Sequence, residues 1–375
     1  MKKILILKFP YRSSFGGGES HTLTLVEELS KMGYQFRLIS SCRVLLAEFK
    51  KRDWPAKKIW ALPEPVAKWS LLVFPFLAIP MFLYLSLILL IQRFRGVRAI
   101  YCLSLTEKIL ATLPARLFGL KVFWMEHVGF RRWLTLNPLR IFYRLGSRLA
   151  TVVVISQALQ QQLRWLGLKE KNIKVIYNGF DFLRFQKLRL AERIQDDNHF
   201  IVGTVCRLEK EKGLEFLLLA AQKAKTIIPN LKLIIVGDGR ERKRLEWLAR
   251  NLEITNWTQF VGWQKDAAQW IKDFDIFVLP SVGRESFGNV LVEALALERP
   301  IITSALEGTP EIVQSMQTGI LVEPGKSEEL AQAIIYLAQN PALARQLAEN
   351  GRVFVEKNFP KEKMIHDFFQ LFATI

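Results

Sequence analysis

The stretch DIFVLPSVGRESFGNVLVEALAL, residues 275–297, shows most clearly how the chain alternates between apolar and polar segments. An apolar run, DIFVLPS, leads into polar and glycine-containing residues, and the apolar run VLVEALAL follows them. This order predicts a strand, a loop and a helix. Glu285 and Glu293 stand eight residues apart in the segment. On one helix they would lie roughly 80° apart, so we place Glu285 in the loop and Glu293 in the second turn of the helix.

The start of this helix predicts a binding site for phosphate. Backbone N–H groups around Phe287, Gly288 and Asn289 lack partners within the helix, and the positive end of the helix dipole lies there. One carboxylate before such a site and one beyond it would suit a nucleotide sugar, which has hydroxyls on both sides of its pyrophosphate. The alternative is an ordinary strand-to-helix junction with a solvated glutamate.

Similar apolar runs alternate with helical stretches along the whole chain. Their apolar residues are continuous, which is typical of parallel strands covered by helices on both faces. The polar stretch LRLAERIQDDNH, 188–199, separates two sets of runs. We therefore expect an α/β protein with two Rossmann-like domains, 1–187 and 188–360, facing each other across a cleft. The last helix, about 361–375, follows Pro360 and is expected to pack back on the first domain.

The length of the chain, its cysteines and its N-terminus indicate what class of protein this is. The 375 residues suffice for two cores, and the three cysteines, Cys42, Cys102 and Cys206, show no metal or redox spacing, which points to a reducing compartment. The N-terminus MKKILILKFP is better interpreted as a strand than as a signal peptide, because Lys8 interrupts the apolar run.

The net charge of +18 comes from the first half of the chain. Residues 1–190 contain 31 Lys and Arg against 10 Asp and Glu. A nucleic acid could be attracted by such a surface, but no nucleic-acid-binding motif supports it. An anionic membrane or a phosphorylated substrate fits the charge equally well.

Three further stretches could contribute to one site. FGGGES, 15–20, lies between a predicted strand and a helix, where glycines let a ligand approach the backbone. His127 ends a predicted strand at the edge where open α/β sheets bind ligands. In CRLEKEKG, Arg207 and Lys212 could hold a diphosphate. The alternatives are a simple turn, a structural histidine and two solvated surface cations.

A metal site is not expected. Asp273 and Asp275 form a D-x-D, but they precede their predicted strand rather than follow it, and we interpret them as structural. Charge on a leaving group would then be met by Arg207, Lys212 and helix dipoles.

In this order, the motifs resemble the retaining GT-B glycosyltransferases of family GT4, also called the glycosyl transferase group 1 family. The resemblance covers nearly the whole chain, and its most specific part is the E-x7-E element from Glu285 to Glu293. It is carried by GGGESHTLTLVEEL, MEHVG, VVVISQALQQQL, VIYNGFDFLRF, VCRLEKEKGLEFLLLAA, LIIVGDG, FVGW, VLPSVGRESFGNVLVEALALERPIITSALEGTPEIV and TGILVEPG.

The resemblance implies a role for each matching residue. Glu285 would bind hydroxyls of the donor sugar, and Glu293 the ribose of the nucleotide. Arg207 and Lys212 would stabilise the departing pyrophosphate, and His127 would contact the donor sugar or the acceptor. The implied donor-binding set also includes Gly16, Gly17, Gly262, which would lie near the base, Ser286, Phe287, Gly288 and Asn289.

The implied activity is transfer of a sugar from a UDP- or GDP-linked donor, with retention of configuration, to a saccharide or lipid-linked acceptor. Polysaccharide or glycolipid synthesis for the cell envelope would be its setting, without a cofactor or a metal. Relatives usually have glycine in place of Glu298 and Glu307, which bears on the identity of the sugar. The alternatives are a nucleotide-sugar 2-epimerase of the same architecture and a non-catalytic scaffold that binds a partner.

The segment SLLVFPFLAIPMFLYLSLILLIQ, 70–92, contains no charged residue. It could reach roughly 33 Å as a helix, but a single crossing would place strands of one sheet on opposite sides of the membrane. Pro75 and Pro80 also disrupt its first part. We expect a helix dipped into one leaflet, on the cytoplasmic face of the membrane, and keep a core helix or a subunit interface as alternatives.

Overall fold

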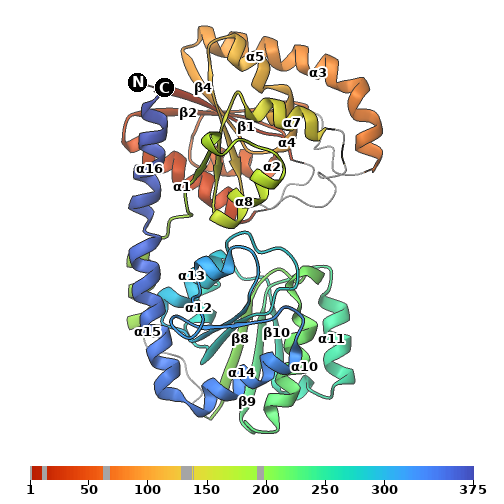
Figure 1. Ribbon diagram of the computed structural model, residues 1–375, viewed down its shortest axis with the longest axis vertical. Coiled ribbons are helices and arrows are strands. Elements are labelled where there is room, and N and C mark those ends of the chain that lie inside the picture. Colours follow the sequence, from red (N-terminus) through yellow and green to blue (C-terminus); the bar gives the residue numbers. More distant parts are fainter. Residues whose placement is uncertain (1, 11–14, 62–67, 128–136, 138, 192–197) are drawn as a thin grey trace. The chain divides into compact units, whose positions relative to one another are not determined.

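The computed structural model describes residues 2–10, 15–61, 68–127, 137, 139–191 and 198–375 (Figure 1). The chain divides into two compact units. The first unit contains Met1–Asn178 and Glu362–Ile375, and the second contains Gly179–Lys361. Both are α/β units with a parallel sheet, so the expected fold class is confirmed for each.

The first unit has a seven-stranded sheet in the order β3-β2-β1-β4-β5-β6-β7. All of its strand pairs are parallel. Its elements are β1 (Lys2–Lys8), α1 (Gly17–Lys31), β2 (Tyr34–Ser40), α2 (Arg43–Lys51), β3 (Ala56–Lys58), α3 (Lys68–Phe94), β4 (Val97–Cys102), α4 (Leu105–Leu110), α5 (Thr112–Leu117), β5 (Lys121–Glu126), α7 (Arg140–Ser147), β6 (Thr151–Val154), α8 (Gln157–Trp165), β7 (Ile173–Val175) and α16 (Lys361–Ala373), the last of which begins at the boundary between the units.

The second unit has a six-stranded parallel sheet in the order β10-β9-β8-β11-β12-β13. Its elements are α9 (Phe182–Leu190), β8 (Phe200–Val205), the 3-10 turn η2 (Lys210–Lys212), α10 (Leu214–Lys225), β9 (Leu231–Val236), α11 (Arg242–Asn251), β10 (Thr258–Gly262), α12 (Ala268–Ile271), β11 (Ile276–Leu279), α13 (Asn289–Ala296), β12 (Ile301–Ser304), the 3-10 turn η4 (Thr309–Glu311), β13 (Ile320–Val322), α14 (Ser327–Gln339) and α15 (Pro341–Asn358).

The continuous apolar runs form the central strands. In β1, Ile4 to Leu7 are buried without alternation, and all four residues of β11 are buried. This is the pattern of strands covered on both faces. The sequence did not predict β3, β7 and β13, each of which has three residues and lies at an edge of its sheet. Such short strands carry too few side chains to show a period.

The last helix packs within the first unit. Phe368 and Phe372 of α16 are buried, and the Phe372 ring contacts Phe123 with a centroid distance of 5.0 Å and Tyr101 at 6.0 Å. Lys2 Nζ donates a hydrogen bond of 2.7 Å to the Ala373 carbonyl. These contacts join the two ends of the chain in one unit.

The boundary between the units requires a correction. We expected it at 187/188, in the polar stretch, but it lies between Asn178 and Gly179. Phe180 N donates to the Phe359 carbonyl at 3.0 Å, and Lys361 N donates to the Phe180 carbonyl at 3.0 Å. Helix α9 then contacts α12 and α13. Because α9 packs on helices of the second unit, it belongs there although it precedes the polar stretch.

Candidate active site

The chain order of the strands predicts where each unit binds a ligand. In the second unit, β8 is followed by β9 on one side, whereas its other neighbour is β11. The loops after β8 and β11 therefore leave in opposite directions and open a crevice at the carboxyl ends of the strands. Arg207 and Lys212 follow β8, and Glu285 follows β11.

Glu285 is held by two side chains from this crevice. Lys212 Nζ lies 2.5 Å from Glu285 Oε2, and both side chains are only 12% exposed. Ser281 Oγ donates to the same oxygen at 3.0 Å. In the described part of the chain, no hydrogen bond reaches Oε1. The carboxylate is therefore fixed through one oxygen, and the other can accept a hydrogen bond from a ligand hydroxyl.

Close backbone packing brings the two loops together. The N–H groups of Val282 and Gly283 both donate to the Glu211 carbonyl at 2.9 Å. Gly213, which precedes α10, has φ +62°, and a Cβ there would lie 2.3 Å from the Pro280 carbonyl oxygen. Only glycine allows this approach, which brings Lys212 within reach of Glu285.

Arg207 differs from Lys212 in its surroundings. Its side chain is 71% exposed, and its ion pair with Glu211 has an N–O distance of 3.6 Å. A pair of this kind is weak, so the guanidinium can turn toward an anion at little cost. The sequence grouped Arg207 and Lys212 as one cationic pair, whereas the structure shows one exposed cation and one held by a carboxylate.

The loop before α13 is held by a buried aromatic ring and turns at a glycine. Phe287 is 2% exposed, and its ring packs on Phe359 with a centroid distance of 5.2 Å. Gly288 precedes the helix with φ +86°. The helix begins at Asn289, and its dipole places partial positive charge at this end, beside Ser286. The buried Phe287 ring thus anchors the loop in the core of the second unit.

Glu293 lies in the second turn of α13, as the sequence predicted, and is half-buried. Burial raises its pKa from 4.5 to about 7, Arg184 lowers it and Asp266 raises it. Arg184 and Asp266 are themselves paired at 2.6 Å. Gly262 ends β10 with φ +86°, and its carbonyl accepts from Gly237 N at 2.8 Å.

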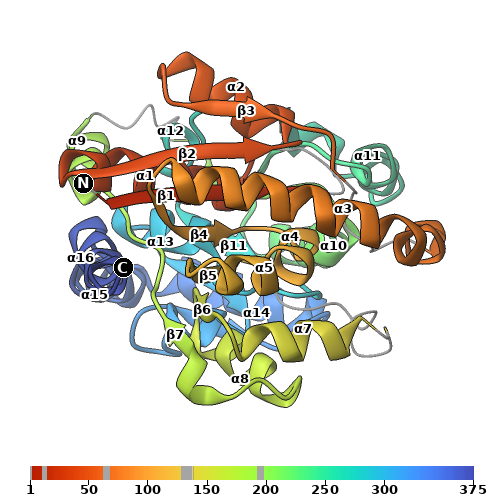
Figure 2. The ribbon, with the colours of Figure 1, turned by 90° about the horizontal axis from the view of Figure 1, so that it is seen from above.

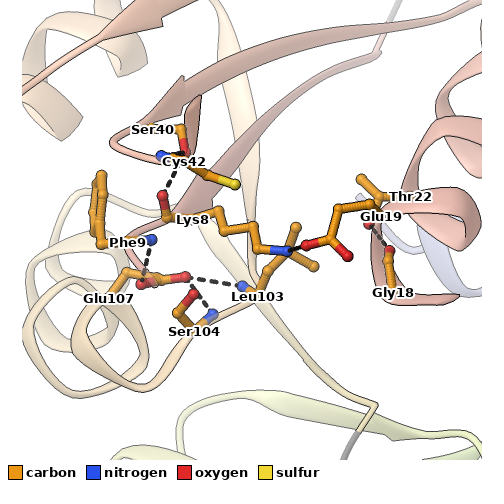
Figure 3. Close-up of polar contacts among 10 residues, drawn as sticks. All are labelled: Lys8, Phe9, Gly18, Glu19, Thr22, Ser40, Cys42, Leu103, Ser104 and Glu107. Atoms are coloured by element: carbon orange, nitrogen blue, oxygen red, sulfur yellow. Dashed lines mark hydrogen bonds and ion pairs between the residues drawn. The ribbon is translucent and has the colours of Figure 1, made fainter. Parts of the chain in front are cut away.

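In the first unit, an ion pair shapes the glycine loop. Lys8 at the end of β1 pairs with Glu19 in the first turn of α1 (Figure 3). Gly16 caps this helix with an extended backbone, and Gly17 is its first residue. The strands β1 and β4 are neighbours whose chain connections diverge, so this loop also follows a strand at a switch point.

Glu107 organises the loops after the two neighbouring strands. Its carboxylate, which is fully buried, accepts from Phe9 N at 3.3 Å, from Leu103 N at 3.0 Å and from Ser104 N (Figure 3). Phe9 follows β1, and Leu103 and Ser104 follow β4. One buried carboxylate therefore satisfies donors from both loops and holds the two loops together.

His127 follows β5 directly, and its Nε2 is shielded from solvent. Burial lowers its pKa well below 6.5, and His21, Lys8 and Lys108 add to this effect. The residue before it, Glu126, pairs with Lys108 at 2.7 Å and accepts from Tyr143 Oη at 2.7 Å, and all three side chains are buried. This network anchors the end of β5, and His127 is neutral at physiological pH.

Asp275, the second aspartate of the D-x-D, has a structural partner. Asp275 Oδ2 accepts from Ile201 N at 2.8 Å, and Asp275 N donates to the Ile201 carbonyl at 2.8 Å. The pair joins the start of β11 to β8. Within the described residues, no group of three His, Cys, Asp or Glu side chains could hold a metal ion.

The sequence missed several residues that shape the site. Glu211 and His21 gave no pattern, because each contacts residues that are distant along the chain, and an isolated serine such as Ser281 near Glu285 forms no pattern by itself. Glu298 and Glu307 both have positive φ, +53° and +39°, which explains why glycine suits these positions. Glu298 accepts from Arg189 and Arg352 at 2.7 and 2.6 Å, and it joins α9 and α15 to the end of α13. Glu307 precedes Gly308, whose N–H donates to the Glu285 carbonyl at 3.1 Å.

Both units match families of known proteins. Residues 186–354 match the family described as "Glycosyl transferases group 1", and residues 15–184 match "Glycosyltransferase Family 4". The lipopolysaccharide core biosynthesis glycosyltransferase LpsE of Rhizobium meliloti is 28% identical over 60% of this chain and 64% of its own length. The capsular polysaccharide biosynthesis glycosyltransferase CapM of Staphylococcus aureus is 27% identical over 64% of this chain and 72% of its own.

Solved structures agree on the fold. Anabaena Alr3699/HepE in complex with UDP has a TM-score of 0.82 at 22% identity, with all of both chains covered. The sucrose-phosphate synthase of Thermosynechococcus elongatus has a TM-score of 0.79 at 22% identity, with 100% and 99% covered. With parallel-sheet units of this kind and family matches over both, the chain belongs to the group 1, family 4 glycosyltransferases and has the GT-B fold.

Proposed function

We propose that this chain transfers a sugar from a UDP- or GDP-linked donor, with retention of configuration, to a saccharide or lipid-linked acceptor of the cell envelope. The observation that carries the proposal is the Glu285 carboxylate, held by Lys212 and Ser281 through one oxygen at the crevice between β8 and β11. The similar HepE structure is a complex with UDP, and LpsE and CapM are named for lipopolysaccharide core and capsule synthesis.

The second unit would bind the donor. The positive end of the α13 dipole would attract a phosphate, and Arg207 would turn from solvent onto the diphosphate. Lys212 lies beside the same crevice and would stabilise the negative charge that develops on the leaving nucleotide. Glu285 Oε1 would accept a sugar hydroxyl, and Glu293 would bind the ribose. These roles need no metal.

The first unit would receive the acceptor. His127 is neutral and lies at the carboxyl edge of the sheet, where it would contact the acceptor or the donor sugar. Gly16 and Gly17 would offer backbone N–H groups at the start of α1.

Helix α3 supports a membrane-associated acceptor. The segment Val73–Phe94 of this helix is long and apolar enough to cross a bilayer. Its most apolar stretch of 18 residues has a mean hydropathy of 2.4, and 22% of that stretch is buried within the protein. One face, with Phe74, Met81, Leu85 and Leu89, packs in the core. The helix also runs between β3 and β4, which belong to one sheet, so a crossing would split that sheet. We therefore propose that α3 lies in one leaflet.

The opposite face of α3 is apolar and exposed. Phe76, Ile79, Leu83 and Leu87 are each more than half exposed. A soluble helix would present polar residues on this face. Burial of these side chains in a leaflet would remove their apolar surface from water.

Two other helices extend this surface with apolar and basic residues. Helix α5 contacts α3 and exposes Leu113, Arg116 and Leu117, and α7 runs across the same side of the first unit (Figure 2). The exposed residues of α7 are Ile141, Phe142, Arg144 and Leu145. Arginines between apolar side chains suit anionic head groups. We propose peripheral binding at the cytoplasmic face of the membrane.

Screening for the donor tests the central proposal. A nucleotide sugar that binds the native state raises the melting temperature, and UDP- and GDP-sugars can be compared in one assay. Incubation of the selected donor with envelope glycolipid fractions should then yield a labelled acceptor with retained anomeric configuration, measured by NMR. Release of an epimerised sugar nucleotide without any acceptor would contradict transfer.

A further inference from the structure

Two histidines from distant parts of the chain contact each other in the first unit. The rings of His21 and His127 have a centroid distance of 4.7 Å and an interplanar angle of 72°, so one ring edge faces the other ring. His21 is 6% exposed and lies in α1, whereas His127 follows β5. The Phe368 ring of α16 also contacts His21, with a centroid distance of 5.4 Å.

The backbone of α1 makes a second contact with the same histidine. A Cβ on Gly18 would lie 3.1 Å from Cδ2 and 3.4 Å from Cγ of His127. The ring therefore packs against a helix backbone that carries no side chain at this point. Gly18 and His21 are three residues apart and lie on one face of α1, so the helix contacts His127 through both.

Packing alone does not explain why a histidine occupies position 21. Neither of its ring nitrogens has a hydrogen-bond partner in the described part of the chain. Burying such groups without partners costs free energy, and leucine at this position would fill the core without that cost. An aromatic ring, by contrast, provides a flat edge with a preferred orientation against a second ring.

We propose that His21 is a positioning residue, which together with Gly18 fixes the plane of the His127 ring at the carboxyl end of β5. This inference rests on the role of His127 in the proposed function. The His21 ring also excludes water from one side of His127, which keeps that imidazole neutral.

The charged groups around the two rings come from four elements. Lys8 lies at the end of β1, and Lys108 of α4 lies beside the end of β5. Their carboxylate partners are Glu19 of α1 and Glu126 of β5. The pKa of His21 is lowered by burial to about 4, so His21 adds no charge of its own above that pH.

The test compares His21→Ala, His21→Phe and Gly18→Ala in the full chain, with the nucleotide sugar that screening selects. His21→Ala should lower kcat at least tenfold and change the KM for the donor less than twofold. Water beside His127 should also move the acid limb of the kcat profile to higher pH. His21→Phe keeps an aromatic edge and should recover most of the lost kcat. Gly18→Ala should lower kcat while the melting temperature stays unchanged or rises, because alanine favours a helix.

Each contrary result has a distinct meaning. Wild-type kcat in both His21→Ala and Gly18→Ala would overturn the inference, as would a loss of kcat with an unmoved acid limb, which would indicate a purely structural role. A kcat for His21→Phe as low as that for His21→Ala would also overturn the inference, since an aromatic ring at position 21 would then not suffice to orient His127. Should His127→Ala retain wild-type kcat, the assigned role of His127 fails, and this inference fails with it.

Discussion

Lys212 Nζ lies 2.5 Å from Glu285 Oε2, and the pair joins two loops that are 73 residues apart in the chain. Both side chains are largely shielded from water. Because little water reaches either charge, each charge is stabilised by the other. The effect of breaking the pair on stability can be measured separately from its effect on catalysis.

We expect Lys212→Met to lower the free energy of unfolding by about 1–3 kcal/mol, because it leaves a shielded carboxylate without its cation. The double variant Lys212→Met with Glu285→Gln should regain most of this stability but remain inactive. Thermal melts and initial rates measure the two effects. If Glu285→Gln alone retains wild-type transfer, the assignment of Glu285 to the donor sugar is wrong.

Arg207→Ala should behave differently, since Arg207 is exposed and weakly paired. Its loss should change the free energy of unfolding by less than about 1 kcal/mol. Transfer should fall on the order of 10²-fold, because a cation is lost from the leaving diphosphate. Arg240→Ala is the matched control, since Arg240 is similarly exposed and its contact with Glu209 measures 4.0 Å. Equal rates for the two variants would contradict the role of Arg207.

The pKa of Glu293 is raised to about 7 from an ordinary 4.5, so ionisation of this side chain lowers the free energy of unfolding as the pH rises. Between these two pH values the native state holds a proton that the unfolded chain has lost, so stability falls as pH rises through this window. Glu293→Gln should therefore stabilise the free protein at pH 8 by up to about 3 kcal/mol, with the gain disappearing toward pH 4.5. Urea denaturation at pH 8 and pH 5 measures this, and an equal gain at both values would refute it.

Transfer should continue after treatment with EDTA. Asp275 is occupied by a backbone contact to Ile201, and cationic side chains can meet the charge of the leaving nucleotide. The measurement is the initial rate before and after chelation, with magnesium or manganese added back. Loss of activity that either ion restores would show that a metal takes part.

The exposed face of α3 should hold the protein on anionic vesicles. Leu83→Ser with Leu87→Ser should release it, and Arg95→Ala with Arg98→Ala should weaken binding mainly at low salt, because only the charge interaction is screened. Ile227→Ser, an exposed apolar residue of the second unit, is the control and should change nothing. Vesicle sedimentation provides the readout. Wild-type protein that stays in the supernatant at low salt would exclude the membrane contact.

The strands at the centre of both sheets can be predicted from the amino-acid sequence, because side chains buried on both faces leave continuous apolar runs such as KILILKF and DIFVLPS. It also placed Glu285 in a loop and Glu293 in a helix, since the 3.6-residue period separates those positions. Local patterns of this kind survive in a linear chain.

Contacts between residues that are distant along the chain became visible only in the folded structure. The contacts of Lys212 with Glu285 and of His21 with His127 depend on which strands are neighbours and on glycines that let backbones approach, and neither leaves a local pattern. The boundary after Asn178 follows from the pairing of Phe180 with Phe359, and the two faces of α3 follow from what the sheet covers. A linear sequence records the polarity of each side chain, but burial and pairing are properties of the folded neighbourhood.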